Sequence, residues 1–139
     1  MTEPDGAPRR RPLSPVDAAL IAEACTKSDL VWVRPLDVCA LLGGRSYALE
    51  VEVVLQVADP LLGDGSYLLK GGPDGATCTR TERAADVALG VGALGAVCLG
   101  GTRLATLARA GVVRGADDAL RRLDLALLAD RLPFHGTHI

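Results

Sequence analysis

The residues with the clearest chemical meaning are the three glycines of Gly90-Val91-Gly92-Ala93-Leu94-Gly95, which fit the pattern G-x-G-x-x-G. They stand between a predicted strand (residues 87–91) and a predicted helix (93–99), the context in which this pattern binds dinucleotides. Such a site also requires a second parallel strand after the helix and an acidic residue about 20 positions further on. Here Gly100-Gly101 and another helical segment follow, and the next acids are Asp117 and Asp118 at a helix start. We therefore interpret the glycines as allowing a helix to pack closely on the sheet, and we expect no cofactor.

Two other groups of residues have a simpler structural explanation than a chemical one. Residues 71–75, Gly-Gly-Pro-Asp-Gly, lack the Lys-Ser/Thr that completes a phosphate-binding loop, so they predict a hairpin turn. Glu50 and Glu52 share one face of a predicted strand and could form an acid pair, but a solvated sheet face is the simpler interpretation.

The cysteines and histidines do not form a metal-binding pattern. Cys25, Cys39, Cys78 and Cys98 include no C-x-x-C pair, and we interpret them as reduced thiols that act as small hydrophobic residues. The histidines, at positions 135 and 138, stand three apart in a short tail without a neighbouring carboxylate or cysteine. We therefore expect no metal site.

The element around which these residues must be arranged is residues 47–57, Tyr-Ala-Leu-Glu-Val-Glu-Val-Val-Leu-Gln-Val. Apolar side chains occupy every second position, which predicts a strand with one buried face. The polar residues on the other face argue against a strand that is buried on both sides in a parallel sheet. We expect a mostly antiparallel sheet with helices packed on its apolar side.

Hydrophobic runs, caps and glycine-rich turns predict the remaining elements. About five strands are expected, at residues 30–33, 47–57, 66–70, 76–82 and 87–91. Helices are expected at residues 14–25, at 37–42 with Asp37 as its cap, at 93–99, at 102–110 with Thr102 as its cap, and from Asp117 to a stop at Pro133.

Length and composition predict one domain of residues 13–139 that follows a flexible, basic and proline-rich arm of residues 1–12. The formal net charge of −2 gives no electrostatic reason to expect a nucleic acid or an anionic membrane as a partner. Since no apolar run approaches the roughly 18 residues that a membrane helix needs, we expect no membrane span and a cytoplasmic location.

Four stretches of the chain carry a family resemblance. They are Val31-Trp32-Val33-Arg34-Pro35-Leu36-Asp37-Val38, Gly72-Pro73-Asp74-Gly75, residues 86–89 leading into 94–101, and residues 104–114. In order and spacing they resemble the C-terminal domain of acetyltransferases of the enhanced-intracellular-survival (Eis) type, a domain with the sterol carrier protein fold. The resemblance implies an α+β fold, with an antiparallel sheet of about five strands and helices on one face.

The resemblance also bears on the chemistry. In the family, two acyltransferase domains precede this one, and the chain's last carboxylate assists proton transfer in the active site. Here a short arm precedes residue 30, so we expect no acyl-CoA site, and the carboxylate of Ile139 stands where the family's terminal group does.

Our first functional hypothesis is a free-standing, non-catalytic domain that binds an apolar small molecule or lipid beneath thin helices of Ala, Gly and Leu. The candidate lining residues are Trp32, Leu36, Tyr47, Val51, Leu94, Val97 and Leu123. A solid core is the structural alternative to this tunnel.

Two other functions stay open. The chain could be an accessory subunit that completes a separate acetyltransferase through its C-terminal tail. It could also be a small isomerase or cyclase of a biosynthetic pathway, whose polar participants would be Arg34, Asp37, Tyr47, Tyr67 and His135. Arg34 and Asp37 could also simply pair with each other.

Overall fold

The computed structural model describes residues 32–131 and 133. The chain divides into units of residues 1–30 and 31–139, and all of the described residues belong to the second unit. The arm predicted for residues 1–12 and the helix predicted for 14–25 lie outside the described residues. The domain boundary predicted at residue 13 therefore stays a prediction.

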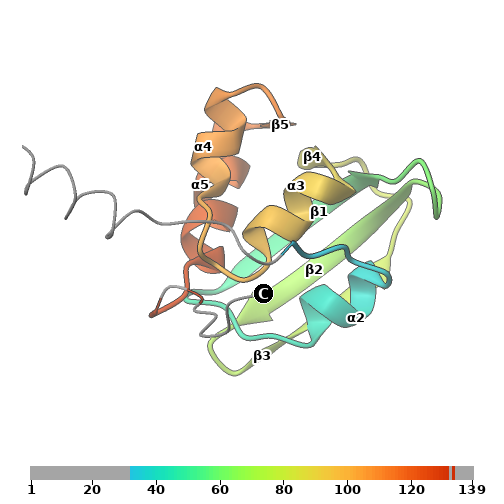
Figure 1. Ribbon diagram of the computed structural model, residues 1–139. Coiled ribbons are helices and arrows are strands. Elements are labelled where there is room, and N and C mark those ends of the chain that lie inside the picture. Colours follow the sequence, from blue (N-terminus) through green and yellow to red (C-terminus); the bar gives the residue numbers. More distant parts are fainter. Residues whose placement is uncertain (1–31, 132, 134–139) are drawn as a thin grey trace, which may run out of the picture. The chain divides into compact units, whose positions relative to one another are not determined.

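A five-stranded sheet forms the centre of the described unit (Figure 1). Its strands are β1 (Val51–Ala58), β2 (Gly65–Gly72), β3 (Gly75–Arg80), β4 (Val87–Gly90) and β5 (Val113–Gly115), in the order β3-β2-β1-β4-β5. Three of the neighbouring pairs are antiparallel, and β1 and β4 are parallel. The predicted α+β fold with a mostly antiparallel sheet of five strands is therefore confirmed, although one parallel pair makes the sheet mixed.

The predicted alternation along β1 is confirmed. Val51, Val53, Leu55 and Val57 are buried, while the residues between them are exposed except Val54. The strand begins four residues later than predicted because residues 47 and 48 bond elsewhere. The N–H of Tyr47 donates to Gly72 of β2, and that of Ala48 donates to Ala126 of the last helix.

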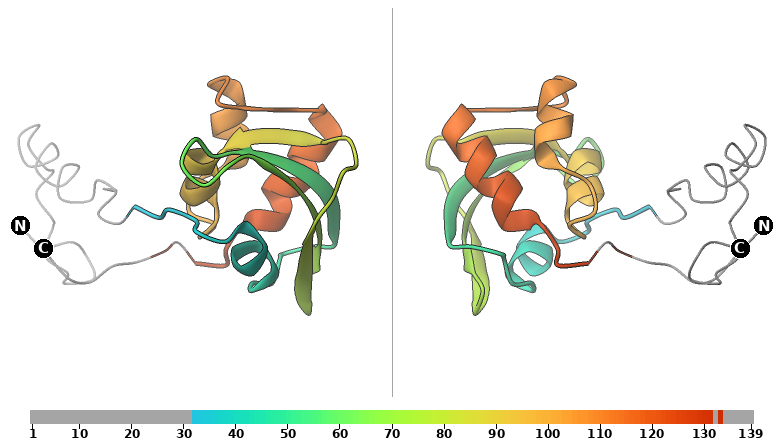
Figure 2. Two further views of the ribbon diagram at one scale, coloured as in Figure 1. Left: turned by 90° about the vertical axis from the view of Figure 1, so that its right-hand side faces the viewer. Right: turned by 90° about the vertical axis from the view of Figure 1, so that its left-hand side faces the viewer.

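Four helices pack on the buried side of the curved sheet (Figure 2). They are α2 (Val38–Gly43), α3 (Val91–Val97), α4 (Leu104–Arg109) and α5 (Asp117–Leu127). Their largest fully buried side chains are Leu42, Leu94, Val97, Leu104 and Leu123, which contact the inward residues of the strands in one core. None of the helices in residues 32–131 is long and apolar enough to cross a membrane.

The predicted helix ends are partly confirmed. Asp37 caps α2, since its carboxylate accepts a hydrogen bond from the N–H of Ala40 at 2.9 Å. Thr102 does not cap α4, because Arg103 occupies the cap position and the carboxylate of Asp124 accepts from the N–H of Ala105 at 3.0 Å. The final helix begins at Asp117 as predicted but ends at Leu127, well before Pro133.

Two arginines form hydrogen bonds that hold the ends of α3, α4 and α5 in place. The guanidinium of Arg45 donates to the carbonyl of Cys98, the C-cap of α3, and to that of Leu127 at the end of α5, where a positive charge is favoured by the helix dipoles. Arg103 bonds the buried carboxylate of Asp124 through Nε at 3.1 Å. Burial alone would raise the pKa of Asp124, but the bonds from Arg103 and from the Ala105 N–H outweigh burial and hold that pKa below its usual value.

The strand predicted for residues 30–33 is wrong in its described part, since Trp32 and Val33 have no regular structure, while residues 30 and 31 lie outside the described residues. Strand β5 lies where no strand was expected. The backbone beside Trp32 instead crosses α3 at Gly95, where a methyl group on the glycine would lie 2.0 Å from the carbonyl oxygen of Val33. The third glycine of the G-x-G-x-x-G pattern therefore permits a close backbone crossing, although the neighbour is this segment and not the sheet.

We predict that Gly95→Ala destabilises the domain by about 1–3 kcal/mol, because the new methyl group forces apart α3 and the Val33 backbone. Gly92→Ala is the matched control, since nothing lies within 4 Å of a methyl group there. In the same helix this control should be neutral or gain up to about 1 kcal/mol. Urea unfolding of both variants measures the difference, and equal stabilities would contradict the crossing.

Candidate functional site

The described residues include large apolar side chains that are exposed, and four of them lie on two adjoining segments. Trp32 and Leu36 precede α2 and are 89% and 77% exposed, and Leu61 and Leu62 follow β1 and are 75% and 55% exposed. We refer to these four residues as the apolar surface. Contiguous exposed apolar patches, unlike single exposed apolar side chains, mark interaction sites.

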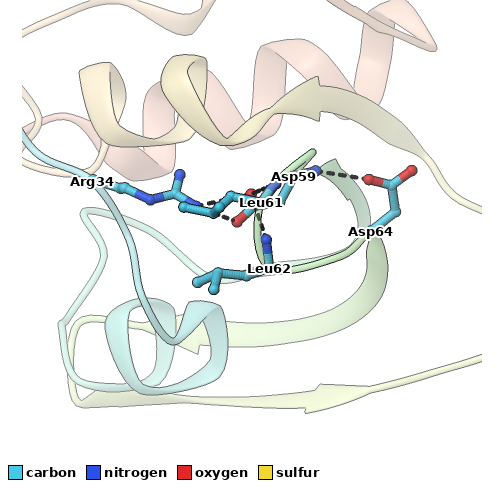
Figure 3. Close-up of polar contacts among 5 residues, drawn as sticks. All are labelled: Arg34, Asp59, Leu61, Leu62 and Asp64. Atoms are coloured by element: carbon cyan, nitrogen blue, oxygen red, sulfur yellow. Dashed lines mark hydrogen bonds and ion pairs between the residues drawn. The ribbon is translucent and has the colours of Figure 1, made fainter.

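An ion pair between Arg34 and Asp59 joins the two segments (Figure 3). One terminal nitrogen of the guanidinium lies 2.9 Å and 3.0 Å from the two carboxylate oxygens of Asp59, which is a buried residue. In Figure 3 the Arg34 side chain reaches from the segment before α2 to the start of the loop that carries Leu61 and Leu62. The ion pair therefore fixes the two halves of the apolar surface relative to each other.

Asp59 also organises the backbone of the loop. One of its carboxylate oxygens accepts hydrogen bonds from the N–H groups of Leu61 at 2.9 Å and Leu62 at 3.1 Å. Its own N–H donates to the Asp64 carboxylate at 2.8 Å (Figure 3). Since these bonds satisfy the loop backbone internally, both leucine side chains can face solvent without freeing a buried amide.

The same contacts keep Asp59 charged. The hydrogen bond from Arg34, followed by that from the Leu62 N–H, lowers the pKa of Asp59 below its ordinary value of 3.8. Sequence reasoning did not find this pair, because Asp59-Pro60 resembles an ordinary turn. The possible pairing of Arg34 with Asp37 is wrong: Asp37 caps α2 instead.

The seven residues predicted to line an apolar site are not brought together as one set. Tyr47, Val51, Leu94, Val97 and Leu123 are each at most 6% exposed and belong to the hydrophobic core. Trp32 and Leu36 are exposed and belong to the apolar surface. Their role in binding a ligand stays a prediction.

The polar residues proposed for catalysis are also separated. The hydroxyl of Tyr47 donates to the Leu42 carbonyl at 2.7 Å, and burial, partly opposed by Arg45, raises the pKa of this tyrosine. The Tyr67 hydroxyl instead accepts a hydrogen bond from Arg80 at 3.4 Å. With Arg34 bonded to Asp59 and Asp37 at its cap, each described candidate has a different partner, while His135 and Ile139 lie outside the described residues.

An open hollow of about 650 Å³ lies at the end of the sheet where β2 turns into β3. The residues that line it include Glu50, Glu52, Lys70, Asp74 and the glycines of the turn. Of the seven predicted lining residues, Val51 alone contacts it. The hollow is open to solvent and four charged residues line it, so it does not match the enclosed apolar site that the sequence predicted.

We predict that Asp59→Asn lowers stability near neutral pH, because the variant loses the ionic bond to Arg34. Because the pKa of Asp59 is lowered in the folded state, the ionised carboxylate adds to the free energy of unfolding above about pH 4. This stabilisation is lost as the pH falls through the lowered pKa. The stability difference between the two proteins should therefore shrink as the pH falls from about 5 to about 2.

Urea unfolding across this range measures the effect of Asp59→Asn. Asp74→Asn, in the exposed β2–β3 turn, is the control for the loss of one carboxylate from the protein's charge. A difference that stays constant with pH would contradict the ion pair.

Comparison with known proteins places the fold in a family. The family model described as a sterol carrier protein domain matches residues 38–136. An uncharacterized N-acetyltransferase of Streptomyces avermitilis is 41% identical over 76% of this chain and 27% of its own length. N-acetyltransferase Eis of Mycobacterium tuberculosis is 39% identical over 79% of this chain, again 27% of the relative.

The solved structure of Eis1 from Mycobacterium abscessus has a TM-score of 0.65 and 33% identity, and the match covers 74% of this chain and 26% of that protein. The chain therefore spans about a quarter of the length of these relatives, at their C-terminal part. The resemblance found in the sequence is confirmed, and the chain belongs to the sterol carrier protein domain family, in the form found in Eis-type N-acetyltransferases.

Proposed function

We propose that this domain is the non-catalytic, partner-binding part of an N-acetyltransferase, and that the apolar surface is where it docks on the acetyltransferase domain. The observation that carries the proposal is the pair of exposed apolar segments fastened by Arg34 and Asp59. The relatives give the partner its chemistry, since they are named N-acetyltransferases and about three quarters of their length lies outside the match.

The physical properties of the apolar surface suit docking. Trp32 offers a large, nearly fully exposed side chain, and tryptophan is enriched among the residues that dominate binding energies. The ion pair and the internal bonds of the loop hold Leu61 and Leu62 in place before a partner arrives. Such pre-organisation reduces the entropy that is lost on binding.

The polar residues predicted for catalysis are bonded to separate structural partners, and this supports a non-catalytic role for the described residues. Acetyl transfer needs an acid–base group placed within hydrogen-bond reach of the reacting atoms. The described candidates are each occupied by a structural partner, as shown above for Tyr47, Asp37 and Arg34. In this proposal the chemistry belongs to the acetyltransferase domain, whether that domain lies in the same chain or another.

A second candidate function is the binding of an apolar small molecule or lipid. Its support is the family description as a sterol carrier protein domain and the exposure of Trp32 and Leu36, two of the seven residues predicted for such a ligand. The other five residues fill the core, so a ligand that reached them would have to separate the helices from the sheet. A ligand on the outer apolar surface would not need that rearrangement.

The proposed docking can be tested by titrating the 139-residue chain with the acetyltransferase region of the Streptomyces avermitilis relative. We predict that the double variant Trp32→Ser/Leu61→Ser weakens binding by roughly 10- to 30-fold, because it removes the central apolar anchors. Val112→Ser is the matched control: Val112 is 53% exposed but precedes β5 at the far edge of the sheet, so affinity should be unchanged.

Three outcomes would decide between the functions. No binding by the unaltered chain, or an equal loss in the control, would overturn the docking proposal. Uptake of a fluorescent fatty acid that Trp32→Ser abolishes, without acetyltransferase binding, would favour the second function.

A role for the carboxylate of Ile139 stays a prediction. Deleting residues 138–139 and measuring the partner's acetylation rate would test it.

A further inference from the structure

Two of the cysteines in the described part of the chain belong to neighbouring elements. Cys39 lies in the first turn of α2, and Cys78 lies in the middle of β3, one of the two edge strands of the sheet. Both are partly buried and pack against the core, and neither is in a disulfide. The functions proposed above use neither of them.

The packing of α2 on β3 brings the two cysteines together. A methyl group on Gly43 would lie 3.8 Å from the Cβ atom of Cys78, so this side of α2 faces the strand (Figure 1). Cys39 is four residues before Gly43 and therefore lies on the same side of the helix. Besides burial, the nearby Cys39 thiol adds to the rise in the pKa of Cys78, as expected for two thiols in close proximity.

The register of the sheet fixes the position of Cys78. It pairs with Leu69 of β2, which in turn pairs with Val53 of β1, and directly paired residues point to the same face. Leu69 and Val53 are buried beneath the helices, so the side chain of Cys78 also points toward α2 and away from the exposed face.

From this juxtaposition we infer that Cys39 and Cys78 form a redox modification site, in which a peroxide converts the two thiols into a disulfide that joins α2 to β3. The inference does not depend on the docking function. The absence of a C-x-x-C pair predicts inert small hydrophobic residues, so this chemistry depends on the position of the two cysteines in the fold.

The reaction balances with one hydrogen peroxide. Burial, and then the neighbouring Cys39 thiol, raise the pKa of Cys78 to about 12, so Cys78 stays protonated at neutral pH. The sulfur of Cys39 therefore opens the reaction: it attacks one peroxide oxygen, the O–O bond breaks, and a sulfenic acid and water form. The sulfur of Cys78 then displaces the hydroxyl group, which leaves with the Cys78 proton as a second water.

The remaining cysteines serve as internal comparisons. Cys98 is buried and its thiol donates to the carbonyl of Gly95 at 3.2 Å, so it has a structural partner of its own. Cys25 lies outside the described residues, and the experiment must exclude it by mapping. Trypsin makes this possible, because each of the four cysteines falls in a different tryptic peptide.

The test uses the reduced full-length chain, treated with hydrogen peroxide and digested without reductant. We predict that the protein loses two hydrogens and that the peptides of residues 28–45 and 71–80, which contain Cys39 and Cys78, become linked. Because the bond closes a long loop of the chain, the midpoint of thermal unfolding should rise by about 10 °C and return when reductant is added.

Serine variants complete the test. Cys39→Ser and Cys78→Ser should each abolish both the mass loss and the thermal shift, while Cys25→Ser and Cys98→Ser should retain them. Mapping of the unaltered protein decides the matter even where a variant does not fold. A link through Cys25 or Cys98, or oxidation without any link, would overturn the inference.

Discussion

The structure depends on the burial of one face of β1. This strand lies at the centre of the sheet, and its inward residues contact the helices, so a single row of side chains connects most of the domain. Val53 and Leu55 are both nearly inaccessible to solvent, and each fully buried aliphatic side chain contributes about 1.5–3 kcal/mol. The opposite face carries Glu52 and Gln56 in solvent, and this contrast fixes the strand register.

Charged side chains fix the ends and positions of the short helices and loops, which apolar burial alone does not determine. Burial is non-directional, so it does not determine where a short helix ends. Arg45 brings the C-terminal ends of α3 and α5 together, and Asp124 of α5 holds the first turn of α4. In the same way, Asp59 holds the loop after β1 and, through Arg34, the segment before α2. Directional bonds from a few ionised groups therefore set the positions of elements that are too short to define them alone.

The sequence predicts those parts of the fold that depend on local pattern. The alternation along β1, the Asp37 cap and the hairpin between β2 and β3 each involve residues close in the chain, and all three are confirmed. Strand β5 is only three residues long, so its pattern is too short to recognise, and it exists because β4 provides a partner. Trp32 and Val33 have strand-like composition, but the crossing at Gly95 determines their path.

The candidate site is less predictable because its contacts join residues that are far apart in the chain. Arg34 and Asp59 are 25 residues apart, and nothing in either neighbourhood indicates that they pair. Alternation identified Tyr47 and Val51 as apolar and inward, but it cannot distinguish a ligand cavity from a filled core, since both have the same pattern. The exposure of Leu61 and Leu62 likewise follows from backbone bonds to Asp59 that composition does not reveal.

At Gly95 the neighbouring backbone leaves no room for a side chain. The passing backbone requires only the third glycine of the nucleotide-binding fingerprint, since a methyl group on Gly92 would meet nothing within 4 Å. The physical demand at Gly95 is for the absence of a side chain and not for any reaction. An invariant glycine at this position would therefore be a record of steric exclusion, and it would persist unchanged even where the surrounding protein has exchanged one biological role for another.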